Sequence, residues 1–267
     1  MKNKIFQEKN KIIENIKISE SFYLMRFKTS HHKIQINPGQ FINIRILNTF
    51  DPLLRRPFSI FDFKDGILSI LYKIQGRGTK ILSQLKSGDT IDYIFPLGNG
   101  FKDVFIKDNI WLVTGGVGIA GIFYLLKFIE DKNIKLFAGF NLLDNAIAIK
   151  ELLKKEKIIA EEDIKISVIK KQNEFFVGDI LKLLQENLKK EKPEIIVGCG
   201  PIEMLKSLYD IASHLKISTE FLMEKQMGCG IGACFGCALK VRENEQIKIK
   251  LVCKDGPVFK GNEIVWI

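Results

Sequence analysis

Three cysteines lie within nine residues near the end of the chain, and this cluster restricts the fold more than any other sequence feature. Residues 227–237 read MGCGIGACFGC, and a fourth cysteine follows after fifteen intervening residues. The C-x4-C-x2-C spacing with a distant fourth cysteine is the plant-type ligand spacing of a [2Fe–2S] cluster. Two iron atoms need four thiolates, and a short loop must wrap around the cluster to deliver three of them. The predicted metal ligands are Cys229, Cys234, Cys237 and Cys253.

Small residues between these cysteines support the same interpretation. They permit a left-handed backbone and a close approach of amide groups to sulfur. The small residues are Gly228, Gly230, Gly232, Gly236, Ala233 and Ala238. Two alternatives stay open: a structural zinc site, which usually has two C-x2–4-C pairs, and cysteines that are inert or disulfide-bonded. Cys199 stands apart and is not counted as a ligand.

The composition is that of a soluble globular protein, with 267 residues, 46% apolar and 27% charged. The formal charge of +10 could suggest nucleic acid as a partner, but only six of the 41 basic residues are arginine and they are scattered. We interpret the charge as solvated surface. The N-terminal segment has no apolar core, and no run approaches 18 apolar residues, so we expect a cytoplasmic chain that spans no membrane.

The first 105 residues predict a domain made mostly of β-strands. Short segments rich in Ile and Phe alternate with Gly- and Pro-containing turns, which is typical of a closed antiparallel barrel. We expect one short helix near 79–86. The predicted strands cover 11–19, 21–29, 40–47, 56–63, 66–74 and 90–95.

The pattern changes near residue 106. Four strand-then-helix units follow up to residue 215, which predicts a parallel α/β sheet with helices on both faces and with sites at the carboxyl ends of its strands. Residues 216–267 form a third, compact and glycine-rich unit. The predicted fold class is therefore an antiparallel β-barrel (1–105), a parallel-sheet α/β domain (106–215) and a small cluster-binding subdomain (216–267).

Three turns in the predicted barrel have residues suited to a flavin: RRPFSI (55–60), YKIQGRGT (72–79) and PLGNGF (96–101). Their order resembles the flavin-binding barrel of the ferredoxin–NADP reductase superfamily. The resemblance implies that Arg56 meets the FAD pyrophosphate, that an aromatic residue and a serine contact the isoalloxazine, and that a Gly-Thr turn holds phosphate. The residues expected to bind FAD are Arg56, Pro57, Phe58, Ser59, Leu71, Tyr72, Lys73, Gly78 and Thr79.

TGGVGIAG (114–121) separates a predicted strand from a helix. It satisfies G-x-G-x-x-G, but the acidic residue of the usual dinucleotide fingerprint is missing. The loop resembles the nucleotide turn of the same superfamily, which commonly has Pro at the position of Gly121. Residues 199–201 resemble its Cys-Gly-Pro beside the nicotinamide, although a buried cysteine before a helix-starting proline is an alternative. The residues expected to bind the nucleotide are Gly115, Gly116, Gly118, Cys199, Gly200 and Pro201. Because no arginine follows the second strand of the sheet, we expect NAD rather than NADP.

A flavin, a nicotinamide nucleotide and a [2Fe–2S] cluster together connect two-electron to one-electron chemistry. The whole chain resembles the electron-transfer subunits of NAD-dependent dihydroorotate dehydrogenases, through LLRRPFSI (53–60), CGIGACFGC (229–237) and VCKDGPVF (252–259). The resemblance implies an FMN-containing catalytic partner that oxidises dihydroorotate in pyrimidine biosynthesis. Electrons then pass through the cluster and FAD to NAD, in a heterotetramer of two subunits of each kind. Phe235 and Phe259 are candidates for contact with that partner, although each could instead pack within its own subdomain.

Three rivals remain. One is a paralogous reductase subunit of the sulfide dehydrogenase or NADH-dependent ferredoxin–NADP reductase kind. Another is a self-contained oxygenase reductase, although its ferredoxin module usually needs more than the 50 or so residues left here. The third is a redox-sensing or zinc-binding module without catalytic turnover.

Overall fold

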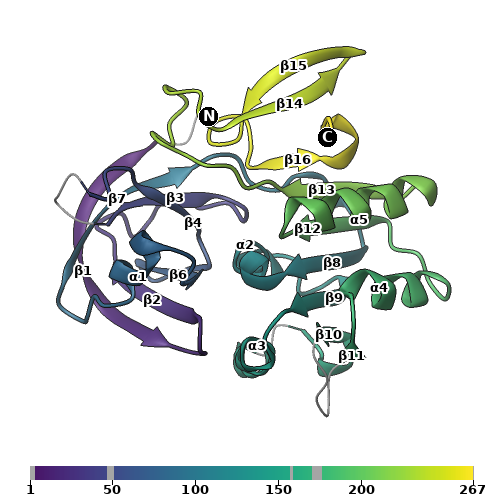
Figure 1. Ribbon diagram of the computed structural model, residues 1–267, viewed down its shortest axis with the longest axis horizontal. Coiled ribbons are helices and arrows are strands. Elements are labelled where there is room, and N and C mark those ends of the chain that lie inside the picture. The colour runs from purple at the N-terminus through teal and green to yellow at the C-terminus, as the bar shows by residue number, and fades with distance from the viewer. Residues whose placement is uncertain (1–3, 47–50, 157–158, 170–175, 267) are drawn as a thin grey trace.

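The computed structural model describes residues 4–46, 51–156, 159–169 and 176–266 (Figure 1). An antiparallel sheet at the N-terminal end and a parallel sheet with helices lie side by side, and a two-stranded hairpin projects beyond them. This arrangement confirms the predicted fold class.

The N-terminal lobe is one curled sheet of seven strands in the order β4-β3-β7-β1-β2-β6-β5. A short helix, α1 (Arg77–Leu82), precedes β7 in the chain. Alternating burial along the strands places large apolar side chains inside the curl, including Phe27, Tyr93 and Phe95. The strands are β1 (Phe6–Lys17), β2 (Phe22–Lys28), β3 (Phe41–Arg45), β4 (Arg56–Ser59), β5 (Asp62–Lys64), β6 (Ile67–Lys73) and β7 (Thr90–Leu97).

The segment expected as a single strand over 56–63 is two strands, because the chain turns a corner there. β4 pairs with β3, whereas β5 pairs with β6 at the other end of the sheet. The backbone N–H of Ile60 donates to Gln40, next to β3, and that of Phe61 donates to Ser69 in β6. The two end strands, β4 and β5, are consecutive in the chain but do not pair with each other in the described sheet. The sheet therefore curls into a half-barrel, and the closed barrel expected from the sequence is wrong in this respect.

The second lobe is a seven-stranded sheet in the order β11-β10-β9-β8-β12-β13-β16. All its pairs are parallel except the edge pair of β13 with β16. Its strands are β8 (Asn109–Gly115), β9 (Asn133–Phe140), β10 (Ile164–Val168), β11 (Phe176–Val177), β12 (Ile195–Cys199), β13 (Ser218–Leu222) and β16 (Val258–Lys260).

Helices cover both faces of this sheet, as predicted. α2 (Ile119–Leu126) and α3 (Leu143–Glu156) pack in the apolar core of one face, and α4 (Ile180–Leu188) and α5 (Ile202–His214) pack in the core of the other. Every residue of α2 is buried, and this helix ends where its apolar run meets Lys127. The 3-10 turns are η1 (Asp103–Ile106), η2 (Gly116–Gly118), η3 (Glu161–Asp163) and η4 (Gly261–Glu263).

The last fifty residues begin and end on the parallel sheet. β13 and β16 extend that sheet, and between them the chain forms a loop over 223–237 and a hairpin of β14 (Ala238–Glu243) and β15 (Gln246–Leu251). Figure 1 shows this yellow segment passing above both lobes. The loop therefore lies close to the barrel as well as to the sheet.

A buried carboxylate fixes the connection between the two lobes. Glu220 in β13 is 3% exposed, and its oxygens accept hydrogen bonds from the backbone N–H groups of Lys102, Asp103 and Val104 at 3.0–3.1 Å. Burial raises the pKa of this carboxyl, although the three N–H donors oppose the shift. The linker that leaves the barrel is thereby tied to β13 of the second sheet.

Candidate functional site

The cysteine-containing loop turns its backbone amides toward sulfur. Cys229 Sγ accepts from the N–H groups of Ile231, Ala233 and Cys234 at 3.5, 3.3 and 3.4 Å. Burial alone would raise the pKa of the Cys229 thiol, but these three N–H groups outweigh it and lower that pKa to about 6. The loop therefore favours a thiolate, the form that binds metal.

The four predicted ligands lie as two neighbouring pairs. Cys229 and Cys234 are hydrogen bonded in the exposed part of the loop. Cys237 and Cys253 are buried, and the N–H of Cys253 donates to Cys237 Sγ at 3.4 Å. Burial, followed by the adjacent Cys237 thiol, raises the pKa of Cys253 to about 12. Two pairs of thiols suit two iron atoms, each held by two sulfurs. In the part of the chain that the structure describes, no three His, Cys, Asp or Glu side chains converge as ligands of one ion would.

Two glycines of the loop meet a steric demand that no other residue would satisfy. Gly230 has φ +74°, and a Cβ there would lie 2.6 Å from the side-chain nitrogen of Asn43. Gly232 has φ +86°, and a Cβ there would lie 2.8 Å from Lys254. Phe235 also has a positive φ, +58°, although it is not a glycine. The chain thus accepts backbone strain to hold an exposed aromatic ring in the cluster loop.

The loop rests on a buried polar group in the barrel that sequence analysis missed. Asn43 in β3 is 0% exposed, and its Nδ2 donates to the carbonyl of Cys229 at 3.4 Å. The backbone carbonyl of Asn43 accepts from Arg55 at 3.4 Å, and Arg55 pairs with the buried Asp92 at 2.5 Å. A line of polar contacts therefore joins the barrel to a cluster ligand. The only sequence signal was one amide within the apolar strand FINIR.

The predicted FAD residues of β4 and α1 lie together. A Cβ on Gly78 would lie 3.2 Å from Nε of Arg56, so this glycine leaves space beside the guanidinium. Arg56 Nη1 donates to the carbonyl of Leu54 at 2.6 Å. Thr79 Oγ1 accepts from the N–H groups of Gln75 and Gly76 at 2.9 and 3.2 Å, which tightens the turn. A cation beside a tight glycine turn suits a pyrophosphate.

The other predicted FAD residues divide between surface and core. Phe58 and Ser59 are half-buried on β4, and Pro57 lies between Arg56 and Phe58. The ring of Tyr72 is 1% exposed, meets Phe58 edge-on with centroids 5.7 Å apart, and donates its hydroxyl to Asn15 at 2.9 Å. Tyr72 is thus a core residue whose side chain is already engaged. Its neighbours in β6 are Leu71, which is buried, and Lys73, which is half-buried.

The two predicted nucleotide turns pack against each other at the carboxyl ends of β8 and β12. These strands are adjacent, with Thr114 opposite Cys199. A Cβ on Gly118 would lie 2.2 Å from the carbonyl oxygen of Cys199, and a Cβ on Gly115 would lie 2.7 Å from Pro201. By contrast, Gly116 has φ +56° and open space around its Cα. The turn is therefore closed on its inner side and open toward solvent, as a phosphate-binding turn must be.

The flavin and nucleotide segments meet at the first turn of α2. A Cβ on Gly121 would lie 3.3 Å from Ser59 Oγ in the barrel and 3.1 Å from Cys199 Sγ in the sheet. The same Cβ position would lie 2.9 Å from Cδ1 of Leu222. Cys199 is fully buried, and burial, with the nearby Glu224 carboxylate adding to it, raises the pKa of its thiol well above the ordinary value. The predicted contacts of the two ring systems thus lie next to each other.

Apolar side chains remain exposed around the cluster loop. Leu53 and Leu54 are 61% and 51% exposed, and Leu54 lies 3.9 Å from the Cβ position of Gly228. Ile231 and Phe235 are 49% and 64% exposed. We call these four residues the loop patch. The other aromatic candidate, Phe259, is only 4% exposed and packs over Gly256, so its expected contact with a partner is wrong.

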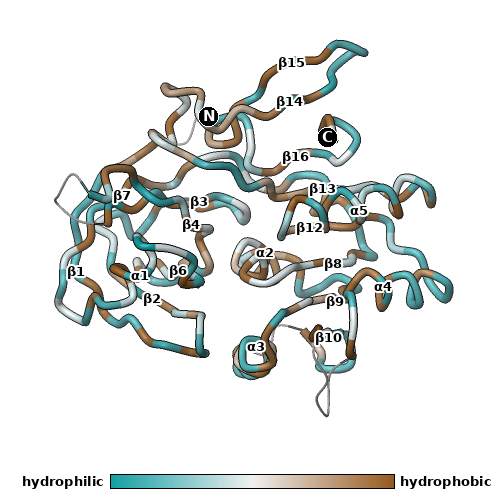
Figure 2. The backbone as a smooth tube through the Cα atoms, viewed as in Figure 1, coloured by the Kyte–Doolittle hydropathy of each residue, from teal (hydrophilic) through white to brown (hydrophobic). Residues whose placement is uncertain are grey.

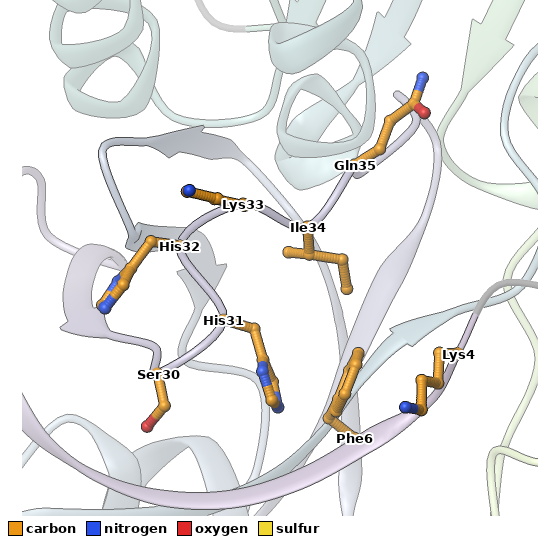
Figure 3. A pocket seen from close by; sticks show the side chains of 8 residues that line it. All are labelled: Lys4, Phe6, Ser30, His31, His32, Lys33, Ile34 and Gln35. Carbon is orange, nitrogen blue, oxygen red and sulfur yellow. The ribbon is translucent and has the colours of Figure 1, made fainter.

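Two surface grooves contain none of the predicted site residues. One, of about 470 Å³, lies on the outside of the barrel and is lined by Lys4, Phe6 and residues 30–35; Figure 3 shows the rings of Phe6 and His31 facing each other. The other, of about 980 Å³, lies between α4 and α5.

Comparisons with known proteins agree with this geometry. Residues 224–265 match the iron–sulfur cluster binding domain of dihydroorotate dehydrogenase B, and residues 9–101 match the oxidoreductase FAD-binding domain. The electron transfer subunit of dihydroorotate dehydrogenase B (NAD(+)) from Clostridium acetobutylicum is 35% identical, with 99% of each chain covered. The subunit of the same name from Caldanaerobacter subterraneus subsp. tengcongensis is 36% identical, covering 97% of this chain and 98% of that one.

Solved structures show the same architecture. The structure of an NADH-dependent reduced ferredoxin–NADP oxidoreductase superimposes with a TM-score of 0.81 at 27% identity, covering 96% of this chain and 90% of that one. A ferredoxin–NADP+ reductase from Neisseria gonorrhoeae superimposes with a TM-score of 0.66 at 16% identity, covering 78% and 91% of the two chains, and supports the fold alone.

Fold and site together define an iron–sulfur flavoprotein oxidoreductase of the ferredoxin–NADP reductase superfamily, with FAD, an iron–sulfur cluster and NAD as cofactors. More specifically, the chain belongs to the family of electron transfer subunits of dihydroorotate dehydrogenase B (NAD(+)). Among the described residues, no helix is long and apolar enough to cross a membrane.

Proposed function

We propose that this chain passes electrons from the FMN of a dihydroorotate dehydrogenase catalytic subunit, through its [2Fe–2S] cluster and FAD, to NAD+ in pyrimidine biosynthesis. The observation that carries the proposal is the position of the cluster loop. Its inner side contacts the flavin lobe through Asn43, while its outer side exposes Ile231 and Phe235. A loop placed in this way can connect an internal flavin to an external partner. Full-length relatives with this subunit name support the proposal.

The proposal assigns a task to each part of the chain. The flavin supplies the conversion between hydride transfer and single-electron transfer. Residues 1–105 would hold FAD, with Arg56 and the turn at 78–79 at the phosphates and Phe58 and Ser59 at the ring. The same unit includes Pro57 and residues 71–73. Each of these assignments is a proposal supported by the contacts among β4, β6 and α1.

Residues 106–215 would hold NAD on the turns at 115–118 and 199–201, because these meet at the carboxyl ends of adjacent strands. Residues 216–267 would hold the cluster with Cys229, Cys234, Cys237 and Cys253. Amides directed at Cys229 favour its thiolate and would stabilise negative charge on the bound cluster. Free cysteines throughout the described chain suit a reducing compartment, which supports a cytoplasmic location.

The partner in this proposal contains FMN and docks on the loop patch. The described residues of the three units are assigned to FAD, NAD and the cluster, so the proposal gives oxidation of dihydroorotate to the partner. Phe235 combines an exposed ring with a strained backbone, which is expected where a residue is held for contact. Two catalytic and two electron-transfer subunits would form the heterotetramer.

A second candidate follows from the structural comparison. The NADH-dependent ferredoxin–NADP oxidoreductase structure covers nearly the whole chain at 27% identity, so a paralogous role with a different partner is the alternative. The two functions differ in the protein that docks beside the cluster.

Reconstitution separates the two functions. Alone, the purified protein should reduce dyes with NADH and should not oxidise dihydroorotate. Mixed with the dihydroorotate dehydrogenase catalytic subunit of the same organism, it should catalyse NAD+ reduction that depends on dihydroorotate. Absence of a complex with that subunit, together with activity toward ferredoxin or sulfide, would favour the alternative.

A further inference from the structure

The β14–β15 hairpin has two different faces. Antiparallel pairing places Lys240 opposite Ile249 and Arg242 opposite Ile247, and residues directly opposite share a face. The other face includes Leu239 and Val241, which are 6% and 0% exposed. That face is covered by the chain end, since Val241 bridges Ile264 and the N–H of Val265 donates to the carbonyl of Lys240 at 3.1 Å.

The first face is open to solvent although it is partly apolar. Ile247 and Ile249 are 60% and 54% exposed, and Lys240 and Arg242 opposite them are exposed too. We call these four residues the hairpin face. In the sheet pairing of the described residues, β15 has β14 as its only neighbour, so its outer edge is unpaired. Figure 1 shows the hairpin projecting from the molecule, and Figure 2 shows apolar and polar residues alternating along β15. Exposed isoleucines on an open edge strand are usually a contact surface or an aggregation risk.

The hairpin face is continuous with the cluster loop. β14 begins at Ala238, directly after Cys237, and β15 ends two residues before Cys253. The N–H of Val252 donates to the carbonyl of Cys237 at 3.1 Å, so the base of the hairpin is fixed to two cluster ligands. A partner that covers the loop patch next to these ligands therefore also lies near the base of the hairpin.

The charges on the hairpin indicate what kind of surface could cover the hairpin face. On the opposite face, Glu243 pairs with Lys248 at 3.0 Å and also with Lys250. Lys240 and Arg242 have no acidic partner among the described residues, so the hairpin face combines two isoleucines with two unpaired cations. A second copy that packed the same face against this one would bring these cations close to the same cations, which is electrostatically unfavourable. Carboxylates beside an apolar strip would complement both features.

We propose that the hairpin face is a second docking surface for the catalytic subunit, which there presents an apolar strip bordered by carboxylates. The inference rests on the proposed function. It adds that cluster-proximal contacts at the loop patch are not sufficient and that the hairpin supplies affinity and orientation through residues remote from all cofactors.

The test uses the full chain with its cofactors and the catalytic subunit of the same organism. Ile247→Ser with Ile249→Ser removes the apolar part, and Lys240→Glu with Arg242→Glu reverses the charge. Matched controls are Ile106→Ser, at an isoleucine 78% exposed, and Lys9→Glu, at an exposed lysine on the barrel. Binding affinity is measured by titration calorimetry and the association rate by stopped-flow fluorescence at several salt concentrations. Iron content, flavin content and NADH–dye activity verify the fold.

Both hairpin variants should keep full iron, flavin and dye activity and should weaken binding at least about ten-fold. The charge-reversed variant should also lose most of the salt dependence of the association rate, while the controls bind as the unsubstituted protein does. Binding unchanged in both variants would overturn the hairpin proposal and leave the proposed function standing. Failure of the unsubstituted protein to bind this subunit would overturn both. A homodimer that dissociates when the isoleucines are replaced would show that a second copy is the occupant.

Discussion

The side-chain amide of Asn43 in the barrel donates to the backbone carbonyl of Cys229, a predicted cluster ligand, at 3.4 Å. This contact joins the flavin lobe to the cluster loop, and it links the fully buried Asn43 to the half-buried Cys229. Asn43→Ala should lower the free energy of unfolding by about 0.5–1.5 kcal/mol, because a hydrogen bond between the two lobes is lost. The variant should also lose iron faster, because Cys229 is less firmly held.

Asn43→Asp provides the sharper comparison. It keeps the size of the side chain but places a carboxylate oxygen against the carbonyl of Cys229, so it should be worse than Ala. Chemical denaturation and the rate of iron release to a chelator measure the two effects. Equal stability and equal iron release in all three proteins would show that this contact holds nothing in place.

Arg56 should be a principal contact of the FAD phosphates. Its guanidinium lies close against Gly78, where a Cβ would be only 3.2 Å from Arg56 Nε. Because a charge-assisted pair of this kind is strong, Arg56→Ala should lose most of its flavin during purification. Arg26→Ala, which breaks an ion pair with Glu14 elsewhere in the barrel, should keep its flavin. A flavin-to-protein ratio unaffected by Arg56→Ala would exclude this role.

The protein should use NADH in preference to NADPH. No arginine occurs between residues 78 and 241, so the whole nucleotide lobe lacks the side chain that best pairs with a 2′-phosphate. Comparison of kcat/KM for the two nucleotides in a dye-reduction assay measures the preference. Equal values, or a preference for NADPH, would mean that a lysine replaces the missing arginine.

The Glu220 linkage makes stability depend on pH. Burial raises the pKa of this carboxyl in the folded protein above its ordinary value of 4.5. At pH values between the ordinary pKa and the raised pKa, the folded state therefore binds more protons than the unfolded state. The stabilisation that protonated Glu220 contributes is therefore complete at pH values below its pKa in the unfolded chain. It is lost as the pH rises through its pKa in the folded protein. Glu220→Gln, which cannot titrate, should flatten this part of the curve of unfolding free energy against pH. A curve that keeps its slope in the variant would assign the titration to another group.

Much of the fold could be predicted from the sequence because each lobe has its own periodicity. Alternating Ile and Phe segments gave the curled sheet, and apolar strands followed by helical segments gave the parallel one. The corner at Ile60 and Phe61 could not be predicted, because the switch of partner from β3 to β6 is a tertiary event. The helix that follows the turn at 114–121 ends at Leu126, where its apolar run stops.

Site residues could be predicted from the sequence where the bound group requires a fixed spacing of its ligands. They could be predicted less well where the packing of distant residues determines their position. The spacing of the four cysteines predicts the ligands, and this assignment stays a prediction. Among the loop glycines, only Gly230 and Gly232 have a left-handed φ. Asn43 could not be recognised, since its role depends on a contact across 186 positions of sequence. Phe259 was misassigned because an aromatic residue after a glycine turn gives no sign of its burial.

The most direct test of the account is low-temperature EPR of the purified protein after anaerobic addition of NADH. Electrons from NADH should reach the cluster and give a [2Fe–2S] signal approaching about one spin per chain, in protein with about two irons and two labile sulfides. Alanine at Cys229, Cys234, Cys237 or Cys253 should abolish the signal while NADH still bleaches the flavin. Alanine at Cys199 should leave the iron content unchanged. One zinc per chain with no labile sulfide, or a flavin that NADH reduces without any cluster signal, would contradict the account.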